Sequence, residues 1–257
     1  MSKFLIKKIN TNVGPLPLVQ TKSNRLYKKI NNSSLISFGK LNKNKYFYVI
    51  KRSPGAGMFS NLTFVMNHLL IAHNHNLIPV IDMENFPTIY NEKKKINGTY
   101  NSWEYFFNPV SKYTLDEVYK SKNVFITSNR FEETMYLDLF HKKFIDLKYK
   151  IKIKKNLSNE FLKLKKKIFL KNKKILGVHF RGTTYKIAKG HAFPLNKKLM
   201  RENIDKLISK YKYDKIFLVT EELDYLNYLK KIYGDKIINI RSFKTKKLDA
   251  FKIYPRK

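Results

Sequence analysis

The sequence contains no cysteine, only one tryptophan, and only seven arginines among its 53 basic residues. The lack of cysteine excludes disulfides and thiolate catalysis, and it is typical of a reducing compartment. No stretch approaches the roughly 18 apolar residues of a membrane span. The apolar run within the first twelve residues is too short for the core of a signal peptide. We therefore expect a cytoplasmic protein without a membrane-spanning segment.

The charge is strongly one-sided, with a formal net value of +34 at pH 7. A basic surface can bind nucleic acid by releasing counterions from phosphates. Base recognition and bidentate phosphate contacts, however, prefer arginine, and these lysines are spread along the whole chain without forming one stripe. We expect no specific nucleic-acid partner and keep peripheral contact with an anionic membrane surface as a secondary expectation. A basic nucleic-acid-binding protein remains the alternative from a different functional class.

The distribution of apolar residues predicts an α/β protein whose hydrophobic content, 43%, is sufficient for a core. Residues 1–44 show little periodicity and are expected to form an arm. Apolar runs with β-branched and aromatic residues predict strands, and apolar residues at a spacing of three and four predict helices. In the first half, strands are expected at 45–53, 77–83 and 123–128, and helices at 62–75 and 157–170.

The second half alternates more regularly between the two kinds of element. Strands are expected at 175–180, 215–220 and 236–240, with helices at 195–211 and 222–233. Such alternation predicts a parallel, doubly wound sheet. Ligands of such sheets bind beyond the carboxyl ends of the strands, so the polar residues at those ends are the first candidates for a site.

The end of the strand at 175–180 carries the most suggestive group of polar residues: His179, Arg181, Gly182, Thr183 and Lys186. Strand alternation places His179 and Arg181 on the same side. A guanidinium can grip a diphosphate through two hydrogen bonds, and an ammonium adds a point charge. Gly182 would allow a phosphate to approach the backbone. An ordinary strand end with solvated charges is the alternative.

Two adjacent carboxylates, Glu221 and Glu222, follow Thr220 at the end of the next strand. They could accept hydrogen bonds from a guanine ring or a ribose. They could equally form a helix N-terminus at which Thr220 caps the helix and the acidic residues complement its dipole. The two interpretations are compatible with each other.

In the first half, Gly55 and Gly57 join a strand to a helix that includes Asn61, so backbone N–H groups there could face an anion. This is a weak phosphate motif because it lacks the third glycine of the dinucleotide fingerprint. Asp82 and Glu84 could hold a divalent cation. The sequence contains no Asp-x-Asp, and we expect no metal.

An aromatic cluster of Trp103, Tyr105 and Phe106 lies in the long connection after the strand at 77–83. Exposed aromatic rings can stack on sugars, but such clusters more commonly form part of a core. The sequence alone does not decide between the two.

Three segments resemble the donor-binding half of the α1,6-fucosyltransferase and NodZ-like family, which is related to the protein O-fucosyltransferases. They are GVHFRGTTYK at 177–186, GHAFP at 190–194 and IFLVTEELDYL at 216–226. The segments SPGAGMFSN and IDMENFP are similar to the first domain of bacterial members. The resemblance covers about residues 45–240.

The resemblance implies a GT-B fold of two Rossmann-like halves, with residues 45–160 on the acceptor side and residues 161–257 binding GDP. It implies inverting transfer of L-fucose from GDP-L-fucose to a glycan or glycolipid, without a cofactor. By position, Arg181 would neutralise the departing β-phosphate and His179 would contact GDP. Glu221 and Glu222 would hold the guanine or ribose, and Lys186 would stand close to the position of the family lysine.

The sequence departs from the family pattern in two respects. Thr184 replaces an expected aspartate, and no carboxylate occurs between His179 and Glu202, where the α1,6 branch places its base. The base is therefore expected in the first half, with Asp82, Glu84 and Glu104 as candidates. The family also extends beyond the third strand of this half, so we expect an incomplete C-terminal half. A transferase of the same fold that uses another nucleotide sugar, or an inactive protein, remains an alternative.

Overall fold

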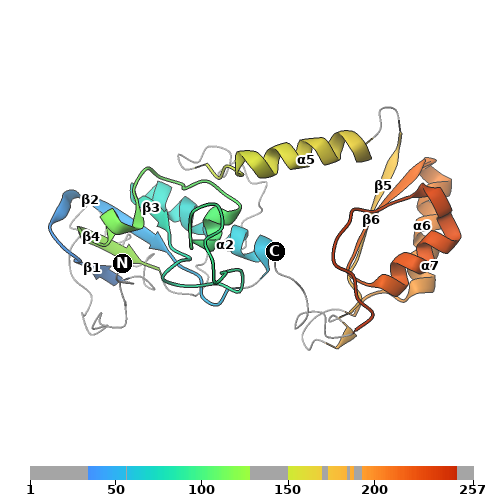
Figure 1. Cartoon of the computed structure of the whole chain (residues 1–257), viewed down its shortest axis with the longest axis horizontal. Coiled ribbons are helices and arrows are strands. Elements are labelled where there is room, and N and C mark those ends of the chain that lie inside the picture. The colour runs from blue at the N-terminus through green and yellow to red at the C-terminus, as the bar shows by residue number, and fades with distance from the viewer. Residues whose placement is uncertain are drawn as a thin grey trace. The chain divides into compact units, whose positions relative to one another are not determined.

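The computed structural model describes residues 34–55, 57–127, 150–169, 173–183, 186–187 and 193–247. The chain divides into two compact units, Met1–Ser158 and Asn159–Lys257. Each unit combines helices with a sheet that contains parallel strands (Figure 1). The predicted α/β class with parallel sheets is therefore confirmed. Within the described ranges, no helix is long and apolar enough to cross a membrane.

The first unit is built on a four-stranded sheet of order β1-β4-β2-β3. The strands β2, β3 and β4 are parallel, and β1 pairs antiparallel with β4. Helix α2 connects β2 to β3, which confirms the predicted β-α-β unit. The elements are β1 (Ser34–Ile36), β2 (Leu41–Ile50), α2 (Met58–Asn74), β3 (Ile78–Ile81), a 3-10 turn η2 (Ser102–Tyr105), α3 (Leu115–Val118) and β4 (Ser121–Ile126).

The expectation of an arm over residues 1–44 is wrong for its last part. Residues 34–36 form an edge strand, and β2 begins at Leu41. A strand of three residues is too short to show periodicity, and its place in the sheet depends on pairing with β4 across some ninety residues of chain. Residues 1–33 lie outside the described residues.

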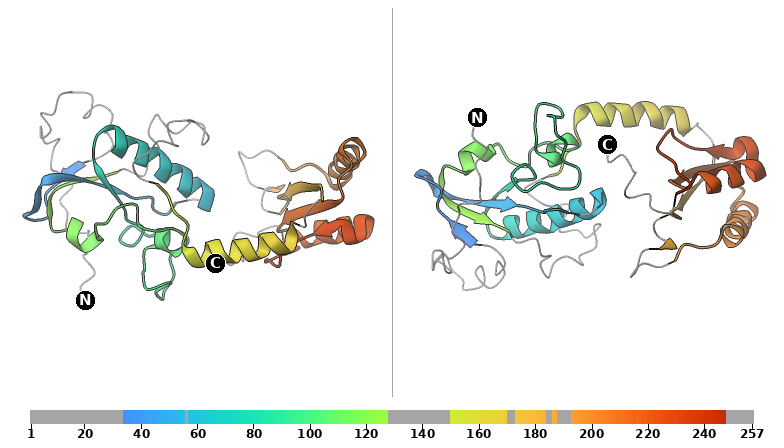
Figure 2. Two further views of the ribbon diagram at one scale, coloured as in Figure 1. Left: turned by 90° about the horizontal axis from the view of Figure 1, so that it is seen from above. Right: turned by 60° about the horizontal axis from the view of Figure 1, so that its bottom comes forward.

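The last four residues of strand β2 are buried on both faces, which explains the unbroken apolar run at the end of the strand. Tyr48 and Ile50 pack into the cluster that includes residues of α2. Phe47 and Val49 pack into a second cluster with Val118, at the end of α3. These four side chains, at the carboxyl end of the ten-residue strand, are 0% exposed. Helix α2 thus covers one face of the sheet and α3 the other (Figure 2).

The second unit contains a parallel sheet of order β5-β6-β7. Its elements are β5 (Ile175–Phe180), α6 (Lys197–Tyr211), β6 (Lys215–Thr220), α7 (Leu223–Tyr233), a 3-10 turn η5 (Gly234–Lys236) and β7 (Ile237–Ile238). Helix α5 (Lys155–Ile168) spans the residue at which the chain divides. The helices begin within two residues of the predicted positions, and the last strand is shorter than predicted.

Both α6 and α7 pack on the same face of this sheet. Leu176 and Val178 of β5 share a cluster with Ile204 of α6 and Leu226 of α7. The alternate residues of the strands face away, and Val219 is 41% exposed. The strands therefore alternate between buried and more exposed positions, unlike the last four residues of β2, which are all buried. A doubly wound arrangement of two GT-B halves stays a prediction.

A buried histidine in the first unit makes acid stability testable. His68 is 0% exposed, its Nδ1 lies 2.8 Å from the Tyr48 hydroxyl, and its Nε2 has no hydrogen-bond partner among the described residues. Burial, followed by the charge of Arg52, lowers the pKa of His68 to about 3. The folded state keeps the ring neutral, whereas the unfolded chain takes up a proton below about pH 6.5.

We therefore expect His68 to reduce the free energy of unfolding by up to about 1.4 kcal/mol for each pH unit between about 6.5 and 3, with no effect above that window. Denaturant unfolding at a series of pH values measures this slope. The double variant Tyr48→Phe/His68→Phe removes the titrating ring together with its partner hydroxyl. An unchanged slope in that variant would show that other groups control acid unfolding.

Candidate functional site

The parallel register of β5 and β6 brings two predicted polar segments together. His179 pairs with Val219 and Phe180 with Thr220, so the two strands end at the same level. The loop that follows β5 and the acidic pair that follows β6 consequently meet at one sheet edge. Thr184 and Tyr185, which belong to the same loop, lie outside the described residues.

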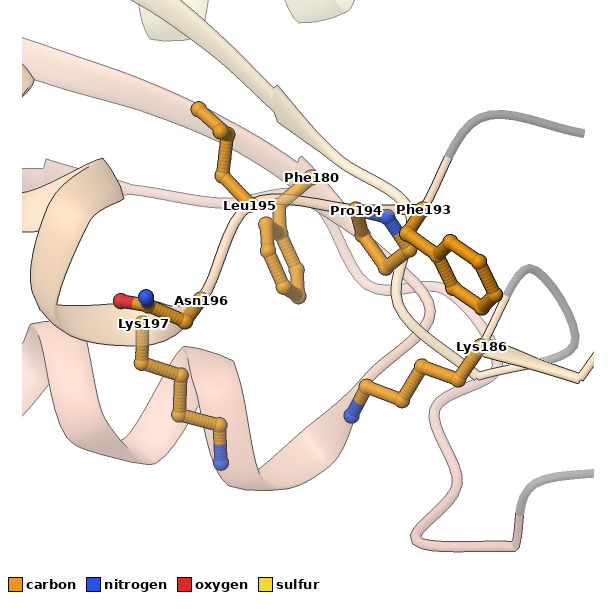
Figure 3. Close-up of a pocket in the computed structure, with 7 residues that line it drawn as sticks. All are labelled: Phe180, Lys186, Phe193, Pro194, Leu195, Asn196 and Lys197. Carbon is orange, nitrogen blue, oxygen red and sulfur yellow. The ribbon is translucent and has the colours of Figure 1, made fainter.

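A buried carboxylate lies at the centre of this edge. The Glu222 side chain is 6% exposed, and its oxygens lie 2.9 and 3.0 Å from the Lys186 ammonium. The Lys197 ammonium, from the first turn of α6, lies 3.4 Å from Glu222 Oε1. One carboxylate thus pairs with two ammonium groups, which offsets the cost of burying its charge. The three side chains together carry a net charge of +1. The two lysine side chains converge from different segments (Figure 3).

Gly182 is required by the packing of this carboxylate. A Cβ atom at Gly182 would overlap Glu222 Oε2 and would lie 2.7 Å from Cε1 of Phe180. We expected a glycine here to allow a phosphate to approach the backbone. The structure gives a different reason, because the Glu222 carboxylate itself occupies the space beside Gly182.

Glu221 is fixed by its neighbours on both sides. Its Oε1 accepts a hydrogen bond of 3.0 Å from the hydroxyl of Thr183, a residue that is 2% exposed. Its carbonyl accepts from the N–H of Thr245 at 2.9 Å. The sequence did not single out Thr245, because the segment that contains it is distant along the chain and lacks a regular pattern.

The predicted capping role of Thr220 is corrected by the structure. The N-cap position of α7 is Glu222, and no side chain caps that helix. The Thr220 hydroxyl accepts instead from the Glu222 N–H at 3.0 Å, two residues along the chain. This short turn aims the Glu222 side chain back toward β5, where the lysines meet it.

A pocket of about 310 Å³ opens beside the lysine pair (Figure 3). Its lining residues come from the end of β5, the following loop and the start of α6: Phe180, Lys186, Phe193, Pro194, Leu195, Asn196 and Lys197. Asn196 caps α6, with its Oδ1 accepting from the N–H of Leu199 at 2.8 Å. The positive end of the α6 dipole adds to the two ammonium groups, so an anion is favoured here.

His179 and Arg181 lie on the other side of the strand. Both are exposed, whereas Val178 and Phe180 between and beside them are buried, as strand alternation predicts. Neither residue lines the pocket beside Lys186. The sheet edge therefore presents cations on two sides. The lysine pair lies on the side that α6 and α7 cover, and Arg181 lies on the side to which the exposed residues of β5 point.

The glycines predicted to cradle a phosphate, Gly55 and Gly57, belong to the first unit, as does Asn61. Gly55 has a φ of 74°, and a Cβ there would lie 3.0 Å from Asn61 Oδ1. Asn61 is 2% exposed, and its N–H donates to the Gly57 carbonyl at 3.0 Å. The contacts described for Gly55 and Asn61 are packing contacts that shape the start of α2.

The expectation that Asp82 could act as a base or metal ligand is corrected. Asp82 is 0% exposed. It accepts hydrogen bonds from the N–H groups of Glu84 and Asn85, from the Asn85 amide, and from the Tyr119 hydroxyl at 2.5 Å. Four donors saturate the carboxylate, so it fixes the turn after β3. Among the described residues, no group of three potential ligands could hold a metal ion.

The aromatic cluster belongs to the core. Trp103 is 2% and Tyr105 5% exposed, and the Trp103 ring stacks on Phe107 at 4.3 Å between ring centroids. Phe106 is partly buried and packs against the same core. The rings of Trp103 and Tyr105 therefore do not form an exposed platform for a sugar, and that alternative is wrong for these two residues.

No protein-family model matches the chain, and no curated protein matches it. Solved structures of a fucosyltransferase are similar to it. They include the fucosyltransferase NodZ from Bradyrhizobium, with 14% sequence identity and a TM-score of 0.46. They also include the NodZ α-1,6-fucosyltransferase co-crystallised with GDP, with 15% identity and a TM-score of 0.43. Each alignment covers 77% of this chain and 79% of the other.

Lys197 is the site residue that the sequence did not reveal. It follows Asn196, whose capping preference marks a helix start. The helix start could therefore be predicted from Asn196. The role of the lysine that follows it could not, because the chain has 53 basic residues and nothing in the sequence distinguishes Lys197 from the others.

The packing of Gly182 yields a stability test with a matched control. Gly182→Ala forces the Glu222 carboxylate away from its position, so we expect a loss of several °C in Tm, corresponding to about 1–3 kcal/mol. Gly177→Ala, within β5, meets no atom within 4 Å and is expected to leave Tm nearly unchanged. Equal Tm values for the two variants would contradict the described packing of Glu222.

Proposed function

We propose that the chain is a glycosyltransferase that moves L-fucose from GDP-L-fucose to a glycan or glycolipid acceptor with inversion. The observation that carries this proposal is the cationic edge of the second sheet, where Lys186 and Lys197 flank a pocket at the start of α6 and the exposed Arg181 follows β5 on the opposite side of the strand. Such an edge suits a nucleoside diphosphate. The choice of GDP and fucose rests on the resemblance of the segments at 177–186 and 216–226 to the fucosyltransferase family.

The chemistry of the transfer explains why cations are needed. Breaking the bond between sugar and diphosphate places negative charge on the departing oxygen and oxocarbenium character on the sugar. Fixed cations close to that oxygen stabilise the transition state more than the ground state. In this proposal Arg181 neutralises the β-phosphate, and Lys186 and Lys197 contribute positive potential without a metal ion.

The two carboxylates after β6 take different roles in this proposal. Glu222 is engaged by two ammonium groups. We propose that it positions them, so that the lysine pair stays at the mouth of the pocket. Glu221 is partly exposed and has one oxygen occupied by Thr183. We propose that its other oxygen accepts a hydrogen bond from the guanine or ribose. His179 completes the proposed donor site, which Gly182 and Thr183 support through their contacts with Glu222 and Glu221. Gly55, Gly57 and Asn61 stay secondary candidates.

The base that removes the acceptor proton is proposed among Glu84 and Glu104, since Asp82 is saturated. Burial raises the pKa of both glutamates. The Asp82 charge raises the pKa of Glu84 further, and the Glu84 charge does the same for Glu104, whereas Lys95 and Lys154 oppose these effects. A raised pKa makes a carboxylate a stronger base, as a general base requires.

The central test is the replacement of Arg181. We expect Arg181→Ala to reduce transfer from GDP-fucose by several orders of magnitude while the thermal unfolding curve stays close to that of the wild type. Arg201→Ala is the matched control, because Arg201 lies on the exposed surface of α6, where it pairs with Asp205 of its own helix and interacts with Tyr228. Near-normal turnover in Arg181→Ala would refute the assigned role.

Isothermal titration with GDP, UDP and a DNA duplex separates the alternative functions. Tight binding of GDP alone supports a fucosyltransferase, and preference for UDP supports a transferase that uses another nucleotide sugar. DNA binding with a steep salt dependence and no nucleotide binding would support the basic nucleic-acid-binding protein.

The lysine pair gives an independent prediction. Lys197→Gln removes one ammonium from the pocket, and we expect the Kd for GDP to rise about tenfold because a charge-assisted contact is lost. Lys198→Gln changes the charge equally on the neighbouring exposed residue and is expected to alter the Kd less than twofold. If the two variants bind GDP equally well, Lys197 serves only as a partner of Glu222.

A further inference from the structure

Helix α5, drawn in yellow in Figure 1, carries most of its apolar residues on one face. Leu157, Phe161, Leu164 and Ile168 follow one another at intervals of four, three and four residues, which places them in one stripe along the helix. In a folded protein such a stripe normally packs into a core. In α5 only Ile168 is buried, whereas nine residues of α2 are buried. Core packing therefore does not explain most of this stripe.

The exposed part of the stripe belongs to the second unit. Phe161 is 60% and Leu164 is 45% exposed, and the neighbouring Leu162 is 49% exposed. The end of the helix is anchored, because the ring of the following Phe169 lies 5.8 Å from the ring of Phe217 in β6. An isolated helix of this length is marginal in water, since most helical stability comes from packing of the apolar face. A partner that covers Phe161 and Leu164 would therefore stabilise α5.

The rest of the α5 surface is strongly basic. The helix contains five lysines, at positions 155, 163, 165, 166 and 167, and one acidic residue, Glu160, so its net charge is +4. All five lysines are exposed. By helix geometry, Lys165 and Lys167 flank the apolar stripe on its two sides. Their long side chains can extend past the stripe while the ammonium groups stay in a polar environment.

An anionic lipid surface suits this combination of groups. A helix with Phe and Leu on one face and lysines on the other lies in the plane of a bilayer interface, with its apolar side chains at the boundary between headgroups and acyl chains. Lysines on both flanks of the stripe then meet the lipid phosphates of one flat surface. Nucleic acid would satisfy the lysines but offers no apolar environment to Phe161 and Leu164.

We propose that α5 binds an anionic lipid surface, with Phe161 and Leu164 inserted below the headgroups and the flanking lysines at the lipid phosphates. The proposal goes beyond the proposed function, because it involves neither GDP nor the pocket beside Lys186. It assigns the expected peripheral contact with a membrane to one defined helix of the chain.

Co-sedimentation of the full chain with vesicles tests the role of the lysines. Vesicles of phosphatidylcholine with about one quarter phosphatidylglycerol are compared with phosphatidylcholine alone, and we expect binding to the anionic vesicles only. Lys165→Gln/Lys167→Gln is expected to weaken binding about thirtyfold, since each lysine contributes about 1 kcal/mol near such a surface. Lys198→Gln/Lys206→Gln removes the same charge from exposed positions of α6 and is expected to weaken binding less than about threefold.

The apolar stripe is tested by a second pair of variants. Phe161→Gln/Leu164→Gln removes the exposed apolar groups and keeps a good helix former at both positions, and we expect vesicle binding to weaken at least about tenfold. Leu41→Gln/Phe59→Gln makes the same two changes at exposed positions of the first unit and is expected to weaken binding less than about twofold.

Fluorescence distinguishes insertion from electrostatic attraction alone. Trp103 is the only tryptophan of the chain and is 2% exposed, so its emission gives a constant background. We expect the emission of Phe161→Trp to shift to shorter wavelengths with anionic vesicles, because the ring at position 161 leaves water. Phe59→Trp, at a position of α2 that is 80% exposed, is expected to show no shift.

Four results would overturn the proposal: no binding to anionic vesicles, equal effects of the two lysine pairs, equal effects of the two Phe/Leu pairs, or no shift in Phe161→Trp. A clear fall in Tm of Phe161→Gln/Leu164→Gln would also overturn it, because the stripe would then pack within the protein. Binding of a DNA duplex in place of vesicles would assign the lysines to nucleic acid instead. GDP affinity in Phe161→Gln/Leu164→Gln is expected to equal that of the wild type, so the donor site is tested separately.

Discussion

The Glu222 carboxylate, which is buried at the edge of the second sheet, places most of the candidate site. Its side chain is 6% exposed, and two ammonium groups from separate segments compensate its charge. The same carboxylate packs against Gly182 and so excludes any larger residue there. Losing both ammonium groups would leave a buried charge uncompensated, which is far more costly than losing an exposed ion pair. The Glu222 carboxylate therefore fixes the relative positions of the loop after β5, the start of α6 and the start of α7.

The sequence predicts the elements that depend on local pattern. Strands β5 and β6 are short apolar runs between turn residues. In a parallel sheet the carboxyl ends of neighbouring strands lie at the same edge, so the sequence predicts that the loop after β5 and the two glutamates after β6 lie close together. Contacts between side chains that are distant along the chain cannot be predicted from the local pattern. Lys197 joins the site only because α6 begins beside β5. One of the four donors that saturate Asp82 is the hydroxyl of Tyr119, which lies 37 positions further along the chain. The edge strand β1 likewise depends on pairing with a remote partner.

The two units differ in the charge of their candidate sites. In the second unit, lysines and an arginine gather at a strand edge, which suits phosphate groups. In the first unit, the exposed Glu84 and the half-buried Glu104 line a cavity of about 390 Å³ at the carboxyl end of β3.

Hydrogen–deuterium exchange of the full chain, with and without GDP, tests most directly whether the second unit holds the nucleotide. We expect slower exchange at the end of β5 and at the start of α6, because backbone N–H groups at a helix N-terminus and a strand end become covered by the diphosphate. The first unit should change little. Exchange that is unaltered in the second unit, or protection confined to the segment around Gly55 and Gly57, would refute nucleotide binding by the second unit.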